Sequence, residues 1–194
     1  LRACGVDLSF APVVALDYGV NKAIGDRALH ARAAAVGELA VAYMHGMRDA
    51  GMMATAKHFP GHGAVVADSH LSLPVDRRSL ADLTNDLQPY RRLIANGLPG
   101  VMMAHVLFPE IDAAPAGFSA YWVQDVLRRD LGFKGLVFSD DLSMQGAAVV
   151  GDIVVRASRA LAAGCDVLPV CNDRAAVAQL FDRRHAEPDP AEQL

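Results

Sequence analysis

Two stretches of the sequence carry the side chains best suited to chemistry. The first runs from Lys57 to Gly63 as K-H-F-P-G-H-G and is followed, four residues later, by Asp68-Ser69-His70. Asp68 and His70 are one residue apart, so in an extended loop their side chains point the same way. A carboxylate bonded to one imidazole nitrogen fixes the tautomer and leaves the other nitrogen for general acid and base work. The alternative is an Asx turn beside a solvated histidine.

The second stretch runs from Phe138 to Met144, where an apolar, strand-like segment ends in Asp140 and Asp141. A carboxylate at the carboxyl end of a barrel strand projects into the mouth, where it can attack an anomeric carbon or stabilise positive charge. Asp140 continues the strand, whereas we expect Asp141 to turn aside and cap the next segment. Two purely helix-capping carboxylates are the structural alternative.

A metal-dependent hydrolase is a second reading of the same residues, since imidazoles and carboxylates suit zinc. Its ligands would come from His58, His62, His70, His105 and Asp140. Pro60, Gly61 and Gly63 exclude a helix, so His58 and His62 cannot share a helical face as a zinc-binding HExxH motif requires. We therefore expect neither a metal nor another cofactor.

The elements that must position these residues alternate between strand and helix, which predicts an α/β fold with parallel strands. Five apolar segments read as strands: 8–16, 52–59, 100–106, 135–140 and 165–170. We expect Lys57, His58, His105 and Asp140 at one shared edge. Five βα units do not close an eight-stranded barrel, which indicates an incomplete (β/α)8 TIM-type barrel without its N-terminal units. An open, doubly wound sheet is the alternative.

Glycines and caps mark the helix boundaries. Helices are expected over residues 30–50 and 120–131, the second capped by Ser119, and C-terminal glycines are expected at Gly51, Gly97, Gly132 and Gly164. The catalytic domain is predicted to span residues 1–185, with a disordered tail over 186–194. The loop from Gly61 to His70 is predicted to be mobile because it has few anchoring side chains.

Composition narrows the class of protein. The chain has 194 residues, 53% of them hydrophobic and 21% charged, as in a globular domain. Its net charge of −4 and scattered basic residues argue against a nucleic-acid partner. No apolar run is long enough to cross a membrane, and none reads as a signal peptide. The three cysteines, in apolar surroundings without CxxC spacing, indicate free thiols and a cytoplasmic location.

The spacing of K-H-F-P-G-H-G and D-S-H resembles that of the cytoplasmic β-N-acetylglucosaminidases of glycoside hydrolase family 3 that act in peptidoglycan recycling. F-S-D-D-L-S-M is similar to the same family, as are F-A-P-V at 10–13, I-G-D-R at 24–27 and A-G-C-D at 163–166. The similarity runs from about Gly5 to Arg174. The stretch from Val149 to Val154 departs from the family in being β-branched at the expected start of a helix.

The resemblance implies a retaining glycosidase that releases terminal β-linked N-acetylglucosamine through a covalent intermediate. It implies that Asp140 is the nucleophile and His70 the general acid/base, with Asp68 as its dyad partner. The sugar-binding positions it implies are Arg27, Lys57 and His58. The implied substrate is N-acetylglucosamine linked to anhydro-N-acetylmuramic acid, with or without peptide. The family also uses an aspartate and an arginine from upstream segments, so an inactive fragment that only binds sugar or a partner stays an alternative.

Overall fold

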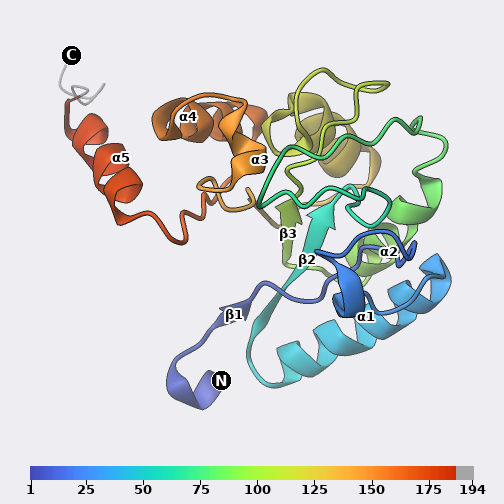
Figure 1. Ribbon diagram of the computed structural model, residues 1–194. Helices are drawn as coiled ribbons and strands as arrows, with labels where there is room; N and C mark the ends of the chain where they lie inside the picture. Colours follow the sequence, from blue (N-terminus) through green and yellow to red (C-terminus); the bar gives the residue numbers. More distant parts are fainter. Residues whose placement is uncertain (187–194) are drawn as a thin grey trace.

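The computed structural model describes residues 1–186, in which strands and helices alternate along the chain (Figure 1). The strands in this part of the chain are β1 (Leu8–Ser9), β2 (Met53–Phe59), β3 (Gly100–Met103) and β4 (Leu136–Phe138). The α-helices are α1 (Ala33–Asp49), α2 (Thr84–Ala95), α3 (Gln145–Ala148), α4 (Ile153–Ala163) and α5 (Arg174–Ala186). Short 3-10 helices are η1 (Arg2–Cys4), η2 (Gly25–Arg27) and η3 (Ala116–Phe118), and η4 (Tyr121–Asp130) is wound as a π-helix. Residues 187–194 of the predicted tail lie outside the described residues.

The strands form one parallel sheet in the order β1-β2-β3-β4. Each strand therefore pairs with the next one along the sequence. A doubly wound sheet instead reverses its strand order at a switch point. The consecutive order agrees with a barrel wound in one direction, and within the described residues it contradicts the doubly wound alternative.

The prediction of five full strands is wrong, because the first and last segments pair only briefly. After β1 the regular ladder gives way to a single bridge between Val13 and Lys57, although the carbonyls of Ala11 and Pro12 still accept the N–H groups of Thr55 and Lys57 at 2.8 and 3.2 Å. The predicted strand 165–170 pairs only at a bridge between Phe138 and Val167. Pro169 cannot donate to a ladder, although its carbonyl accepts the Leu142 N–H at 2.9 Å.

The predicted helix boundaries are largely confirmed. Gly51, Gly97, Gly132 and Gly164 all have positive φ angles, at 74°, 82°, 71° and 109°, and each follows the end of a helix. The hydroxyl of Ser119 accepts the Trp122 N–H at 3.1 Å at the start of η4. The β-branched stretch from Val149 to Val154 lies where α3 gives way to α4.

An aromatic cluster fixes the carboxyl end of β2. The ring of Phe59 meets the rings of Tyr90 and Trp122 edge-on, with centroids 5.0 and 6.2 Å away, and Phe108 lies 5.1 Å from Trp122. All four side chains are fully buried. Because Phe59 directly follows Lys57 and His58, its burial holds the pair of candidate site residues at the sheet edge.

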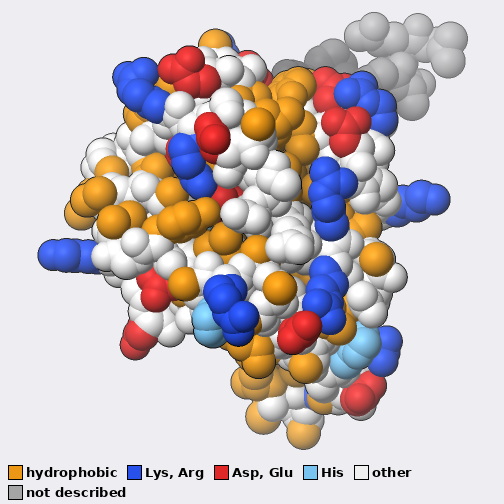
Figure 2. Space-filling model, turned by 90° about the vertical axis from the view of Figure 1, so that its right-hand side faces the viewer, with side chains coloured by type: hydrophobic (Ala, Val, Ile, Leu, Met, Phe, Trp, Pro, Cys, Tyr) orange, Lys and Arg blue, Asp and Glu red, His pale blue; other side chains and the backbone are white. Residues whose placement is uncertain are grey.

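The face drawn in Figure 2 carries charges of both signs. Figure 2 shows basic side chains standing among acidic, apolar and uncharged ones on the face drawn. Among residues 1–186, no helix is both long enough and apolar enough to cross a bilayer. That nucleic acid is not a partner stays a prediction.

Candidate active site

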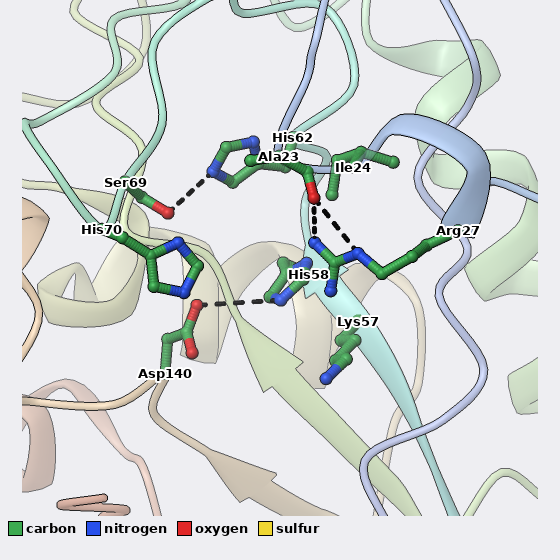
Figure 3. A pocket seen from close by; sticks show the side chains of 9 residues that line it. All are labelled: Ala23, Ile24, Arg27, Lys57, His58, His62, Ser69, His70 and Asp140. Atoms are coloured by element: carbon green, nitrogen blue, oxygen red, sulfur yellow. Dashed lines mark hydrogen bonds and ion pairs between the residues drawn. The ribbon is translucent and has the colours of Figure 1, made fainter. Parts of the chain in front are cut away.

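A pocket opens where the strands end, and it gathers five of the six predicted site residues (Figure 3). Its lining consists of Ala23, Ile24, Arg27, Lys57, His58, His62, Ser69, His70 and Asp140. Asp68 does not line the pocket, but its carboxylate is hydrogen-bonded to the imidazole of His70. Lys57 and His58 come from the end of β2, and Asp140 from just beyond β4. The predicted shared edge is therefore confirmed, although the chemical roles stay predictions.

A register shift in β2 explains how two consecutive residues reach the same pocket. Adjacent side chains of a regular strand point to opposite faces. The pairing of β2 with β3 shifts between Lys57 and Phe59, and such an irregularity re-aims side chains. Lys57 and His58 consequently both line the pocket.

Asp140 is a buried carboxylate that stays ionised. Its side chain is 11% exposed, and its Oδ1 atom accepts the Asp141 N–H at 2.9 Å. Burial alone would raise the pKa of this carboxyl, but the nearby imidazoles, the Asp141 N–H and Lys57 outweigh burial and lower it. A charged carboxylate at a strand end is available either to attack an electrophilic carbon or to stabilise positive charge.

Asp141 has a different and structural environment, as its predicted turn away from the strand implies. Its Oδ1 atom accepts three hydrogen bonds: from the Ser143 N–H at 2.9 Å, the Ser143 hydroxyl at 2.7 Å and the Cys171 N–H at 3.1 Å. Its carbonyl oxygen lies 3.0 Å from Nε2 of the fully buried His105. Asp141 therefore joins the loop after β4 to the segment around Cys171.

The two cationic side chains of the pocket approach from different elements. Arg27 belongs to η2, and its Nε donates to the carbonyl of Ala23 at 3.1 Å, which holds the guanidinium along the pocket wall (Figure 3). The Lys57 ammonium lies 5.9 Å from the centre of the Phe10 ring. Burial lowers the pKa of Lys57, partly offset by Asp140. Both positions suit hydrogen bonding to a polar ligand.

Asp68 and His70 form the predicted pair. The imidazole Nδ1 lies 2.7 Å from Asp68 Oδ1, and the same oxygen accepts the His70 backbone N–H at 2.9 Å. The backbone N–H bond is the main cause that lowers the pKa of Asp68. An ionised Asp68 accepts the hydrogen on Nδ1, which leaves Nε2 of His70 for proton transfer. The Asx turn considered as an alternative is present as well, since one oxygen makes both bonds.

The reason given for a mobile loop is wrong, although its mobility stays a prediction. His62, Val65 and Ser69 are only 3%, 5% and 3% exposed, so the loop does have anchoring side chains. Ser69 escaped the sequence prediction altogether, and His62 was considered only as a metal ligand. The alternation of Asp68, Ser69 and His70 was the available signal, because two outward side chains imply an inward one between them.

The geometry does not favour the metal-dependent alternative. Within residues 1–186, no three His, Cys, Asp or Glu side chains are arranged to hold a metal ion. His105 lies away from the pocket, stacked on Phe118 with ring centroids 5.3 Å apart. His62 makes hydrogen bonds through both ring nitrogens, to Asn21 and Ser69.

Comparisons with known proteins show to which family the chain belongs. The model of the glycosyl hydrolase family 3 N-terminal domain matches residues 1–187. A β-hexosaminidase of Thioalkalivibrio sulfidiphilus is 55% identical over 190 residues, which cover 98% of this chain and 55% of that protein. A β-hexosaminidase of Thiobacillus denitrificans is 60% identical over 173 residues, which cover 89% of this chain and 48% of that protein.

Solved structures give the same result. The crystal structure of NagZ from Neisseria gonorrhoeae in complex with N-trifluoroacetyl-D-glucosamine has a TM-score of 0.87 and 46% identity, and the match covers 97% of this chain and 54% of that one. The chain thus spans about half the length of the curated relatives it matches. The parallel sheet matches the family's N-terminal barrel domain. The chain belongs to glycosyl hydrolase family 3, where it resembles the bacterial β-hexosaminidases of the NagZ type.

Proposed function

We propose that this chain provides the catalytic residues of a retaining β-N-acetylglucosaminidase. The observation that carries the proposal is the placement of an ionised, buried Asp140 and the Asp68–His70 pair around one pocket. A retaining glycosidase needs a carboxylate nucleophile on one side of the scissile bond and a proton donor on the other. Here an imidazole takes the place of the usual second carboxyl group.

The proposed reaction has two steps. In the first, an Asp140 oxygen attacks the anomeric carbon while the bond to the leaving oxygen breaks, and His70 gives its Nε2 proton to that oxygen. In the second, His70 takes a proton from water, and the water oxygen attacks the anomeric carbon and displaces Asp140. The two steps return His70 and Asp140 to their starting protonation states and release the sugar with its original β configuration.

The remaining pocket residues are proposed to bind the sugar. Burial lowers the pKa of His58 to about 3, so its imidazole is neutral and can donate one hydrogen bond and accept another. Arg27, from η2, and Lys57, from the end of β2, supply further donors. Hydrogen bonds from fixed donors to the sugar hydroxyls would orient the anomeric carbon toward Asp140.

The finer substrate assignment rests on the family resemblance. We propose N-acetylglucosamine linked to anhydro-N-acetylmuramic acid, with or without its peptide, and a cytoplasmic role in peptidoglycan recycling. The relative from Neisseria gonorrhoeae binds N-trifluoroacetyl-D-glucosamine, which supports the sugar part of this assignment. We further propose that this chain forms part of a (β/α)8 barrel, whose other segments complete the pocket.

The test is a chimera in which this chain replaces the matching segment of the Thioalkalivibrio sulfidiphilus β-hexosaminidase. We expect it to release 4-nitrophenol from the N-acetyl-β-glucosaminide, and to form the β anomer of the sugar first when the reaction is followed by NMR. The Asp140→Asn chimera is the matched control. A chimera that folds, as judged by circular dichroism and cooperative unfolding, but is no faster than this control would refute the proposed activity.

A binding-only fragment is the second candidate. Apolar side chains of the segment between β1 and η2 stay exposed, including Phe10 at 36%, Tyr18 at 41% and Val20 at 43%. Exposed apolar surface is typical of a region that another segment or partner covers. The isolated chain separates the candidates: ligand-observed NMR with N-acetylglucosamine would detect binding, and the chromogenic assay would detect turnover.

A further inference from the structure

The dyad residues flank a buried serine. Ser69 is 3% exposed, whereas the side chains of its neighbours Asp68 and His70 are 36% and 62% exposed. A small polar side chain between two exposed, functional ones is not needed to fill the core. Its burial therefore raises the question of what holds it there.

Ser69 is held at both its side chain and its backbone. Its hydroxyl lies 3.0 Å from Nε2 of His62, and its carbonyl accepts the Gly146 N–H at 2.9 Å. A Cβ atom at Gly146 would lie 2.9 Å from that carbonyl, so the close approach requires glycine. The segment between Asp68 and His70 is thus attached to the β2 loop on one side and to α3 on the other.

The tautomer of His62 follows from its second partner, Asn21. The amide orientation of Asn21 is unambiguous, because its Oδ1 accepts the Ile24 N–H at 2.8 Å while its Nδ2 lies 2.7 and 2.6 Å from the carbonyls of His62 and Val65. Nδ2 also lies 2.9 Å from His62 Nδ1. The NH2 group of Asn21 has two hydrogens for three acceptors, so one hydrogen is shared. A hydrogen on Nδ1 of His62 would point at this donor, which favours the tautomer that carries its hydrogen on Nε2. That hydrogen points at the Ser69 hydroxyl.

Asn21 also shapes the segment that carries Arg27. Its side chain accepts from Ile24, and its carbonyl accepts the Gly25 N–H at 2.9 Å, so it stabilises the turn into η2. His62 in turn meets His58 edge-on, with ring centroids 5.8 Å apart. These contacts therefore connect three parts of the pocket: the turn that precedes Arg27, the end of β2 at His58, and the loop that carries Asp68 and His70 (the dyad loop).

We propose that Asn21, His62 and Ser69 form a relay of positioning residues that sets where His70 stands over the pocket. Asn21 fixes the hydrogen on His62 Nε2, His62 donates to Ser69, and Ser69 orients Asp68 and His70 outward. The relay does not react with substrate. The effect of the relay on the rate of hydrolysis rests on the proposed acid/base role of His70. The hydrogen bonds within the relay do not depend on that role.

The first test uses the chimera and two substrates. Ser69→Ala should lower kcat/KM by about tenfold or more for an alkyl N-acetylglucosaminide, whose leaving group needs protonation, and by less than about twofold for the 2,4-dinitrophenyl glycoside. Ser72→Ala, which changes an exposed serine of the same loop, is the control and should leave both rates unchanged. His62→Gln should retain more activity than His62→Ala because it keeps a side-chain donor.

Equal losses of Ser69→Ala on both substrates would mean a merely structural serine and would overturn the positioning role. The second test uses the isolated chain and needs no activity. Nitrogen-15 NMR should find the hydrogen of His62 on Nε2, and a hydrogen on Nδ1 would contradict the relay. Ser69→Ala, but not Ser72→Ala, should speed amide exchange at Gly146, whose N–H donates to the Ser69 carbonyl. An inactive chimera would refute the proposed function and leave this second test intact.

Discussion

The Oδ2 atom of Asp140 lies 3.8 Å from Nε2 of His58, across the end of the strand that separates β2 from β4. Both side chains are about nine-tenths buried. Because burial lowers the pKa of His58 to about 3, the imidazole faces the carboxylate in its neutral form. At neutral pH the carboxylate of Asp140 is thus ionised and has no cationic histidine beside it, so its negative charge is available for nucleophilic attack.

This burial predicts acid sensitivity. Burial lowers the pKa values of His58, His62 and His105, so between the unfolded value and the folded one the unfolded chain binds more protons. The free energy of unfolding should then fall as pH drops below about 6.5, by up to about 1.4 kcal/mol per pH unit for each histidine. Urea unfolding at several pH values measures this slope.

His58→Gln is expected to reduce that slope between about pH 6 and pH 4, since it removes one of the buried titrating groups. His30→Gln, which changes an exposed histidine, is the matched control and should leave the slope as it is. A wild-type stability that is flat over this range would show that these imidazoles do not stay neutral in the folded chain.

A trapping experiment should label Asp140 and leave its neighbour Asp141 unlabelled. With a slow fluorosugar substrate, mass spectrometry of the chimera should find one sugar on the peptide that contains Asp140. Asp140→Asn should abolish the label because an amide is a poor nucleophile. Asp141→Asn should keep it, since an amide oxygen can still accept the bonds from Ser143 and Cys171. A label on Asp141, or turnover without any adduct, would contradict the assignment.

The substitution Asp141→Ala should instead lower the free energy of unfolding. Asp141→Ala leaves two backbone N–H groups and a hydroxyl without their acceptor, and each of these part-buried or exposed hydrogen bonds contributes about 0.5–1.5 kcal/mol. The denaturation midpoint of Asp141→Ala should fall well below that of Asp141→Asn. Equal midpoints would mean that these hydrogen bonds contribute little to the fold.

The dyad predicts a dependence on the leaving group. His70→Gln should slow the hydrolysis of alkyl N-acetylglucosaminides by about a hundredfold or more but slow dinitrophenyl glycosides much less, because only the former need protonation in the first step. Asp68→Asn should cause a smaller loss of the same kind, since the amide oxygen can still accept a hydrogen bond but the negative charge is lost. A uniform loss over all leaving groups would argue against His70 as the acid.

Two glycines, Gly63 in the dyad loop and Gly46 in α1, should respond in opposite ways to substitution by alanine. A Cβ atom at Gly63 would lie 1.9 Å from the carbonyl oxygen of Leu16, so Gly63→Ala should destabilise the chain by about 2 kcal/mol or more. A Cβ atom at Gly46 in α1 would have no other atom within 4 Å, and Gly46→Ala should stabilise by about 0.5–1 kcal/mol. Thermal unfolding of both variants checks the opposite signs.

Local sequence was enough to predict where four helices end and where strand β2 ends. Gly51, Gly97, Gly132 and Gly164 needed only the short-range preference of glycine for positive φ, and the end of β2 at Phe59 needed only the place where an apolar run stops. For the same reason Lys57, His58 and Asp140 could be assigned to one edge, because parallel strands present their carboxyl ends together. The spacing of Asp68 and His70 allowed either a side-chain pair or an Asx turn, and both hydrogen bonds are present.

Only the tertiary structure decided which neighbours each side chain meets. The partners of Ser69 are His62, seven residues away, and Gly146 in α3, and the tautomer of His62 depends on Asn21, 41 residues away. The lengths of the first and last strands also depended on it, since beyond β1 these two segments meet their neighbours at isolated bridges, Val13 with Lys57 and Val167 with Phe138. Hydrogen bonds and burial between distant segments arise from the packing of the whole chain, and the pattern of residues along any one segment does not contain them.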